Sequence, residues 1–188
     1  MSLEHAILGF LAGGPMTGYD LKTRGFDRTA SHVWTADQAQ VYRTLDRLVK
    51  RRLATSRAVP QRGKPDRRLY SITPRGREEL ATWLAAHEEL PPYRDPFLLR
   101  MLFASDLSDA DLLRLLAETR DDYMRRLEQI RTRLAATPER NREDAVRRMT
   151  LEASAAAARS AIDWIDACAD RVRSGLPAPA LPGMGGAG

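Results

Sequence analysis

Four polar side chains recur at helical spacing in one short stretch, and their types suit contact with nucleic-acid bases and phosphates. They are Gln40, Arg43, Arg47 and Lys50. Intervals of three, four and three residues place them on one side of a helix. Gln40 can pair with an adenine edge and Arg43 or Arg47 with a guanine edge, whereas Lys50 suits phosphate. The pattern predicts a helix that enters the major groove of DNA.

The segment around this helix is strongly basic. Between Arg43 and Arg77 it holds twelve Lys or Arg, interrupted only by Asp46 and Asp66. Such an excess of positive charge on a small unit favours a polyanionic partner. Three of these cations lie in or beside a Gly-Lys-Pro turn, where a wing tip would reach the minor groove or the backbone. They are Arg62, Lys64 and Arg67.

Two short helices are expected before the basic helix. The first begins near Ser2 and stops at the Gly-Gly-Pro of residues 13–15. Thr17 can cap the second helix, with Asp20 completing a capping box, and backbone N–H groups there could take a phosphate. Residues 25–34 are predicted to form a polar connection.

The basic helix itself is expected to start near Ala36, because Thr35 and Gln38 form a capping box. Its apolar side would pack inward through Val41, Leu45 and Leu48. Strands are predicted over 54–59 and 67–72, on either side of the Gly-Lys-Pro turn. Thr73 and Pro74 then start a helix that would run to about His87 and bury Leu80, Trp83 and Leu84.

The second half is predicted to be helical throughout. A short helix follows Asp95 and Pro96, and a long helix begins at Ser108. A last helix is expected from Thr137 and Pro138 to about Ser174. It carries an apolar seam of Leu151, Ser154, Ala158, Ala161, Ile165, Cys168 and Val172. This seam suggests a homodimer, and packing within one chain is the alternative.

Charge divides the chain in the same place. Residues 1–87 hold fifteen basic and eight acidic residues, a net +7, whereas residues 88–188 hold fifteen and seventeen, a net −2.

The predicted helices and strands together give a fold class that is mainly α with a small β-wing. Its domains would be a winged helix-turn-helix over 1–87, a helical dimerisation domain over 95–174, and a flexible tail over 175–188.

No catalytic or metal-binding pattern stands out. Cys168 has no second cysteine to pair with, and His5, His32 and His87 lack metal-ligand spacing. No nucleophile or phosphate-loop motif is present, so neither an enzyme, a metal nor a cofactor is predicted. Without a signal peptide or a long apolar run, a cytoplasmic protein with no membrane partner is expected.

Five stretches of the first half resemble the PadR family of transcriptional regulators. They are residues 6–11, 14–21, 40–48, 63–73 and 76–80, with the sequences AILGFL, GPMTGYDL, QVYRTLDRL, GKP through YSIT, and GREEL. The segment RDPFLL at 94–99 and Phe103 are similar to the virulence-activator type of C-terminal domain found in one PadR subfamily.

The resemblance implies a homodimeric winged-helix protein, usually a repressor and often responsive to small molecules, in which the C-terminal helices and the first helix form the dimer. It implies DNA contacts from Gly18, Tyr19, Gln40, Tyr42, Arg43, Lys64 and Arg67. A His often precedes the Gly-Tyr pair in the family. Thr17 stands there in this chain, as a cap and a hydroxyl donor to phosphate.

These observations lead to one functional hypothesis and one rival. The chain is expected to be a sequence-specific regulator, binding double-stranded DNA at a pseudo-palindromic operator as a homodimer. The rival is a winged-helix protein-interaction module that does not read sequence. Trp164 is a candidate for lining a small-molecule effector cavity, and a core position is its alternative.

Overall fold

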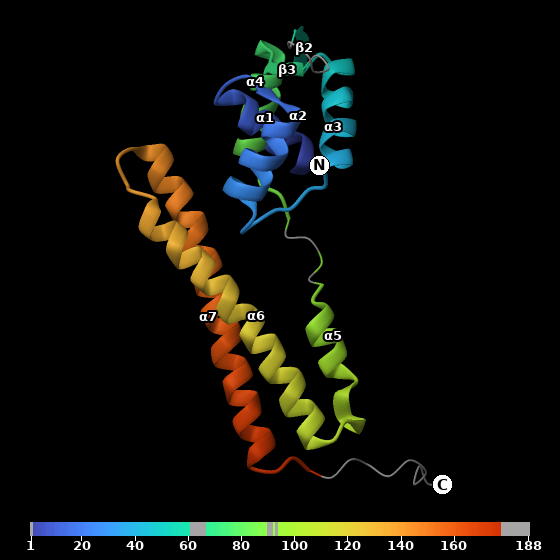
Figure 1. The fold of residues 1–188 in the computed structure, drawn as a ribbon, viewed down its shortest axis with the longest axis vertical. Coiled ribbons are helices and arrows are strands. Elements are labelled where there is room, and N and C mark those ends of the chain that lie inside the picture. Colours follow the sequence, from blue (N-terminus) through green and yellow to red (C-terminus); the bar gives the residue numbers. More distant parts are fainter. Residues whose placement is uncertain (1, 61–66, 90–91, 93, 178–188) are drawn as a thin grey trace, which may run out of the picture. The chain divides into compact units, whose positions relative to one another are not determined.

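Helices form most of the chain, and a small sheet lies in its N-terminal half (Figure 1). This computed structural model describes residues 2–60, 67–89, 92 and 94–177. The chain divides into two units, Met1–Leu90 and Pro91–Gly188. None of the helices in the described ranges is long and apolar enough to span a membrane. The expected class, mainly α with a small β-wing, is confirmed.

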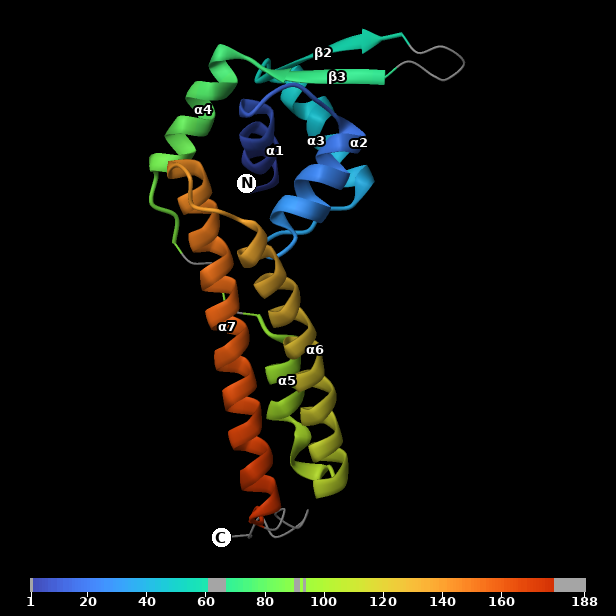
Figure 2. The same ribbon diagram turned by 60° about the vertical axis from the view of Figure 1, so that its left-hand side comes forward.

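The first unit has the element order of a winged helix-turn-helix. Its elements are α1 (Ser2–Ala12), β1 (Met16–Thr17), α2 (Gly18–Asp20), η1 (Leu21–Ala30), α3 (Gln38–Lys50), β2 (Ala54–Val59), β3 (Arg67–Ile72) and α4 (Pro74–Ala85). The core between them is closed by the largest fully buried side chains, which include Ile7, Phe26, Leu45 and Tyr70. Strands β2 and β3 have the predicted bounds and extend side by side as a hairpin arm (Figure 2).

Sequence reasoning missed the third strand, β1. The sheet order is β1-β3-β2, and β1 pairs antiparallel with β3 through Met16↔Tyr70 and Thr17↔Leu69. A strand of two residues carries too short an alternation to be recognised from the sequence. Its pairing nevertheless ties the start of α2 to the wing.

The polar connection predicted over residues 25–34 is wrong. The chain stays helical from α2 through η1, a wide, π-type helical segment that ends at Ala30. Gly25 and Phe26 are buried there, and the Phe26 ring meets Phe10 edge-on at 5.3 Å between centroids. Tyr19, in the short α2, is 64% exposed.

Two further predicted boundaries are also wrong. The basic helix α3 is capped by Asp37 rather than Thr35, and Gln40 rather than Gln38 completes its capping box. Helix α4 ends at Ala85, and on it Leu84 is exposed and Trp83 only partly buried. The predicted cap Thr73 is correct, since its hydroxyl accepts a hydrogen bond from the Gly76 N–H at 3.0 Å.

The second unit is a helical hairpin with a short helix before it. Its elements are α5 (Pro96–Leu102), η2 (Ala104–Asp106), α6 (Asp109–Ala136) and α7 (Arg142–Arg173). Asp95 and Ser108 cap α5 and α6 as predicted. Helix α7 starts later than predicted, because the Asn141 side chain caps it and Thr137 instead ends α6.

The apolar seam of α7 packs on α6 of the same chain. Leu151, Ala158, Ile165 and Val172 are buried as predicted, but the intervening buried positions are shifted by one residue. They are Ala155, Ile162 and Ala169. Arg120 on α6 crosses to Asp166 on α7 with two hydrogen bonds, of 2.7 and 3.1 Å. The seam is thus covered within one chain and is no argument for a dimer.

Candidate nucleic-acid interface

Gly18 allows the start of α2 to pack closely against the middle of α3. Gly18 is buried, and a β-carbon at this position would overlap the ring of Tyr42, 2.7 Å from Cζ. The Tyr42 ring, itself exposed, therefore covers the first turn of α2. Only glycine leaves room for this arrangement, which places Tyr19 and Tyr42 on neighbouring turns of the two helices.

Thr17 serves the fold at this point. Its Oγ1 accepts a hydrogen bond from the Asp20 N–H at 3.1 Å and donates to Asp20 Oδ2 at 2.7 Å. That hydroxyl bond is the main reason why the pKa of Asp20 lies below its ordinary value, and positive charge on Arg24 and Arg67 adds to the effect. The Thr17 proton that was expected for phosphate is thus directed to Asp20.

Strand pairing places Arg67 near α2. This wing residue is exposed at the start of β3, two residues before Leu69, which pairs with Thr17. Farther along β3, burial raises the pKa of Tyr70. Strand β3 pairs with β1 through Thr17↔Leu69, and Gly18 at the start of α2 packs against Tyr42 of α3, so these elements are brought together.

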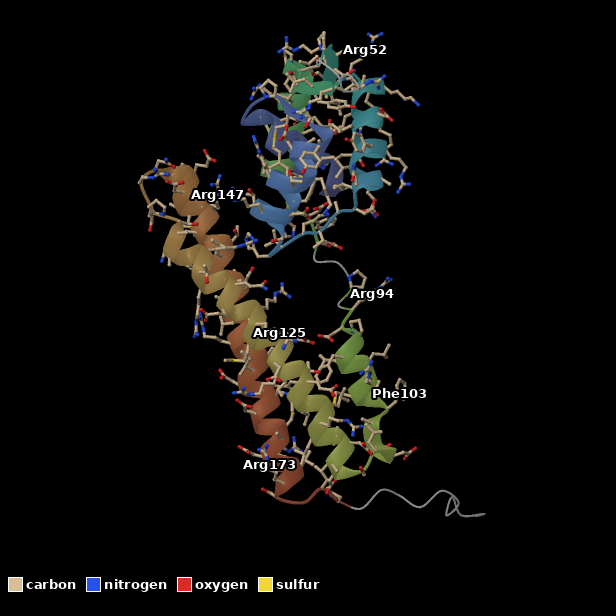
Figure 3. All side chains as sticks on the ribbon, viewed as in Figure 1. Arg52, Arg94, Phe103, Arg125, Arg147 and Arg173 are labelled. Carbon is tan, nitrogen blue, oxygen red and sulfur yellow. The ribbon has the colours of Figure 1, made fainter. Side chains whose placement is uncertain are left out.

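The outer side of α3 carries two exposed cations. Arg43 and Lys50 are exposed, whereas Val41, Leu45 and Leu48 are buried, as the spacing predicted. Figure 3 shows side chains projecting from α3 away from the rest of the first unit. Arg43 and Lys50 thus lie on the solvent-exposed side of α3.

Gln40 and Arg47 lie on the flank of α3 and are held by other residues. The Gln40 Oε1 accepts a hydrogen bond from the Asp37 N–H at 3.1 Å, as part of the cap. Arg47 donates from Nε to Glu4 on α1 at 3.2 Å and from Nη2 to Thr44 at 3.1 Å. Both side chains would have to leave these partners to reach a base.

A shallow hollow of about 330 Å³ lies along this flank. Its lining comes from α1, from the segment before α3, and from α3: Leu3, Trp34, Thr35, Gln40, Arg43, Thr44 and Arg47. Trp34 is exposed here.

Two predicted wing-tip residues, Arg62 and Lys64, lie outside the described residues.

In the second unit, Trp164 is exposed and meets Phe97 edge-on at 6.1 Å between ring centroids. Among the residues that the structure describes, no group of three or more His, Cys, Asp or Glu could hold a metal ion.

Sequence reasoning missed Glu4 and Asp37 as parts of this region. Asp37 had a local signal, since it stands three residues before Gln40, but the Thr35–Gln38 pair offered the same pattern. Glu4 had none, because its partners Arg47 and Arg51 are more than forty residues away in the chain.

Both halves of the chain match known families. Residues 7–82 match the model of the PadR-like transcriptional regulator family, and residues 93–173 match that of the virulence activator alpha C-terminal domain. The chain is 43% identical over 94 residues to a probable transcriptional regulator of Mycobacterium tuberculosis, a match covering 50% of this chain and 48% of that protein.

A second relative is the negative transcriptional regulator PadR of Bacillus subtilis. It is 36% identical over 107 residues, which cover 56% of this chain and 58% of that protein. The chain thus matches about half the length of each curated relative. The crystal structure of B. subtilis PadR with operator DNA has a TM-score of 0.84 at 24% identity, covering 92% of this chain and 99% of that one.

B. subtilis PadR has also been solved with p-coumaric acid, and that structure gives a TM-score of 0.77 at 25% identity, covering 92% of this chain and 99% of that one. The two family models follow one another along the chain and together span most of it, in agreement with the observed elements. The chain therefore combines a PadR-like transcriptional regulator domain at residues 7–82 with a virulence activator alpha C-terminal domain at residues 93–173.

Proposed function

We propose that this protein is a sequence-specific DNA-binding repressor that binds a pseudo-palindromic operator as a homodimer. The observation that carries the proposal is the surface shared by the first turn of α2, the outer side of α3 and strand β3. Exposed cations from two of these elements, Arg43, Lys50 and Arg67, lie on it. A major groove about 12 Å wide admits one helix, and α3 presents its polar side for that purpose.

Roles follow from these positions. Arg43 is assigned to base edges and Lys50 to phosphate, since a guanidinium pairs with guanine through two hydrogen bonds. Tyr19 and Tyr42 are assigned to the backbone beside the groove, and Gly18 to seating Tyr42. Arg67, Arg62 and Lys64 are assigned to the wing. Thr17 and Gln40 remain proposed contacts, each of which would exchange an intramolecular partner for DNA. Arg47, predicted from the sequence as a base contact, is held by Glu4 and Thr44 and is not assigned to DNA.

The homodimer is supported by an uncovered apolar side of α5. Leu99, Leu102 and Phe103 are exposed there, and Leu102 and Phe103 are each 73% exposed. Figure 3 shows Phe103 at the end of α5. Such a patch marks an interaction surface, and a second copy is the occupant that a two-fold operator requires. Two recognition helices would then lie about 34 Å apart, one turn of DNA.

A small-molecule effector would relieve repression. The p-coumaric acid complex of B. subtilis PadR supports this part of the proposal. Trp164 is the candidate contact in this chain, because its exposed indole packs edge-on against Phe97. An aromatic ligand could stack on the free face of the ring.

Selection of bound fragments from the source genome with the purified protein tests the proposal. One operator should be preferred over random duplex by about a thousandfold or more, and the recovered site should be nearly palindromic. Equal affinity for all duplexes would instead support the winged-helix interaction module.

A further inference from the structure

One buried acid, Glu4, holds Arg47 of α3 and Arg51, the C-cap residue of the same helix. Glu4 on α1 has a side chain only 5% exposed, and its two oxygens contact different guanidinium groups. Oε1 accepts from Arg47 Nε at 3.2 Å, and Oε2 accepts from Arg51 Nη1 at 2.5 Å. Arg47 and Arg51 are one helical turn apart, so a single carboxylate spans both.

Further contacts hold both arginines in place. Arg47 also donates to the Thr44 hydroxyl, and Arg51 reaches Glu79 on α4 at 3.3 Å. The cluster therefore links α1, α3 and α4. The cluster lies at the C-terminal end of α3, where the chain turns toward the wing. It holds the side chains of Arg47 and Arg51 against α1.

Glu4 is more deeply buried than Arg47 and Arg51, so removing the acid and removing the arginines should have different effects. Glu4 is enclosed and, as a charged group, depends on its cationic partners. Arg47 and Arg51 have side chains 54% and 48% exposed, so without Glu4 they would still be hydrated. Loss of the acid would leave Arg47 only the Thr44 hydroxyl and Arg51 only the partly exposed Glu79, so both side chains could turn toward phosphate. Loss of both arginines would instead strand a buried charge.

We propose that Glu4 is a positioning residue that determines specificity by keeping Arg47 and Arg51 off the DNA backbone. This inference rests on the proposed DNA binding. Cations on phosphate strengthen binding to every sequence alike, so extra ones raise non-specific affinity and dilute base readout.

The test uses full-length Glu4→Gln protein and fluorescence anisotropy with operator and random duplexes between 50 and 200 mM salt. Each added phosphate contact steepens the plot of log affinity against log salt by about 0.9, so two steepen it by about 1.8. The affinity lost by random duplex over that salt range should then grow about tenfold. The ratio of operator to random affinity should fall.

Glu78→Gln is the matched control. It removes the same charge from an exposed position on α4, and the salt slope should stay at the wild-type value. The double variant Glu4→Gln, Arg47→Ala should lose about half of the slope that Glu4→Gln adds, because Arg47 can then no longer contact phosphate. A folded Glu4→Gln protein with the wild-type slope and specificity ratio would overturn the inference.

A second arm keeps the test decisive if Glu4→Gln does not fold. Arg47→Gln in the otherwise native protein should leave the salt slope unchanged, since Glu4 already withholds this cation. A slope shallower by about 0.9 would show that Arg47 contacts phosphate and would refute the proposal. The native protein's own preference for operator over random duplex separately decides the proposed function.

Discussion

The Tyr42 ring occupies the space that a side chain at residue 18 would need. A β-carbon on Gly18 would lie 2.7 Å from Tyr42 Cζ and 3.1 Å from Cδ1. We predict that Gly18→Ala displaces the exposed ring into solvent, with a stability change below about 1 kcal/mol. DNA affinity should fall by about tenfold or more, or about 1.4 kcal/mol, because the surface between α2 and α3 is altered. Thermal melts and anisotropy titrations measure the two effects.

A double variant identifies the cause of that loss. If the added methyl group acts through Tyr42, then Gly18→Ala with Tyr42→Ala should bind DNA as Tyr42→Ala alone does. Independent, additive losses from the two changes would contradict this explanation.

Gly76 and Gly9 should respond oppositely to alanine. At Gly76 a β-carbon would lie 2.9 Å from Ile72 Cγ1 and closer still to the Leu53 carbonyl oxygen, which belongs to the backbone and has little freedom to move. Gly76→Ala should destabilise the first unit by about 1–3 kcal/mol through overpacking. At Gly9, inside α1, a β-carbon meets nothing within 4 Å, so Gly9→Ala should stabilise by about 0.5–1 kcal/mol. Urea unfolding of both variants checks the sign of each change.

Local signals explain which parts of this fold the sequence predicts well. Thr73 before Pro74 and Asp95 before Pro96 each combine a cap with a proline at the first helical position, and both helices start there. The wing strands are bounded by the helix end and the Gly-Lys-Pro turn, so their limits were predictable as well.

Other features depend on competition or on distant contacts. Thr35–Gln38 and Asp37–Gln40 are overlapping capping boxes, and the structure forms the second, with the Asp37 carboxylate 2.7 Å from the Gln40 N–H. Residues 25–34 were predicted as a polar connection, yet this segment is helical through Ala30, and Phe26 is buried against Phe10. The ion pairs of Glu4 cross from α1 to α3, and a single sequence carries no periodic signal for such a pair.

The Thr17 cap should contribute stability that depends on pH. Thr17→Ala removes the bonds to the Asp20 N–H and carboxylate and should cost about 1 kcal/mol near neutral pH. The hydroxyl bond lowers the pKa of folded Asp20 below the ordinary 3.8, so its contribution is present above pH 3.8 and is lost as pH falls through the folded value. The stability gap between wild type and Thr17→Ala should therefore narrow below pH 3.8.

Urea unfolding at neutral pH and near pH 3 measures that gap. Thr17→Ser keeps a hydroxyl and should retain most of the pH-dependent part. A gap that stays constant across the acid range would mean that the Asp20 carboxylate does not take part.

Helix α5 should be required for the dimer. Leu102→Glu places a charge on the exposed apolar side that we assign to the second copy, and burying it unpaired would be costly. Light scattering after gel filtration should show the wild type as a dimer and the variant as a monomer of unchanged helix content. Leu84→Glu makes the same change at an exposed position on α4 and should remain dimeric. A Leu102→Glu protein that remains dimeric would show that the dimer interface does not use this side of α5.

Arg43 and Lys50 should differ in what they contribute to DNA binding, although both are exposed on α3. If Arg43 reads a guanine edge, Arg43→Ala should cost about 1–3 kcal/mol on the operator and relax the preference at one base pair. Lys50→Ala should weaken operator and random duplex alike and reduce the salt slope by about 0.9, as expected for one lost phosphate contact. Titrations against operators changed at single positions separate the two. Equal weakening of operator and random duplex by Arg43→Ala would place that guanidinium on the backbone, and base readout would then have to come from Gln40 after it leaves the α3 cap.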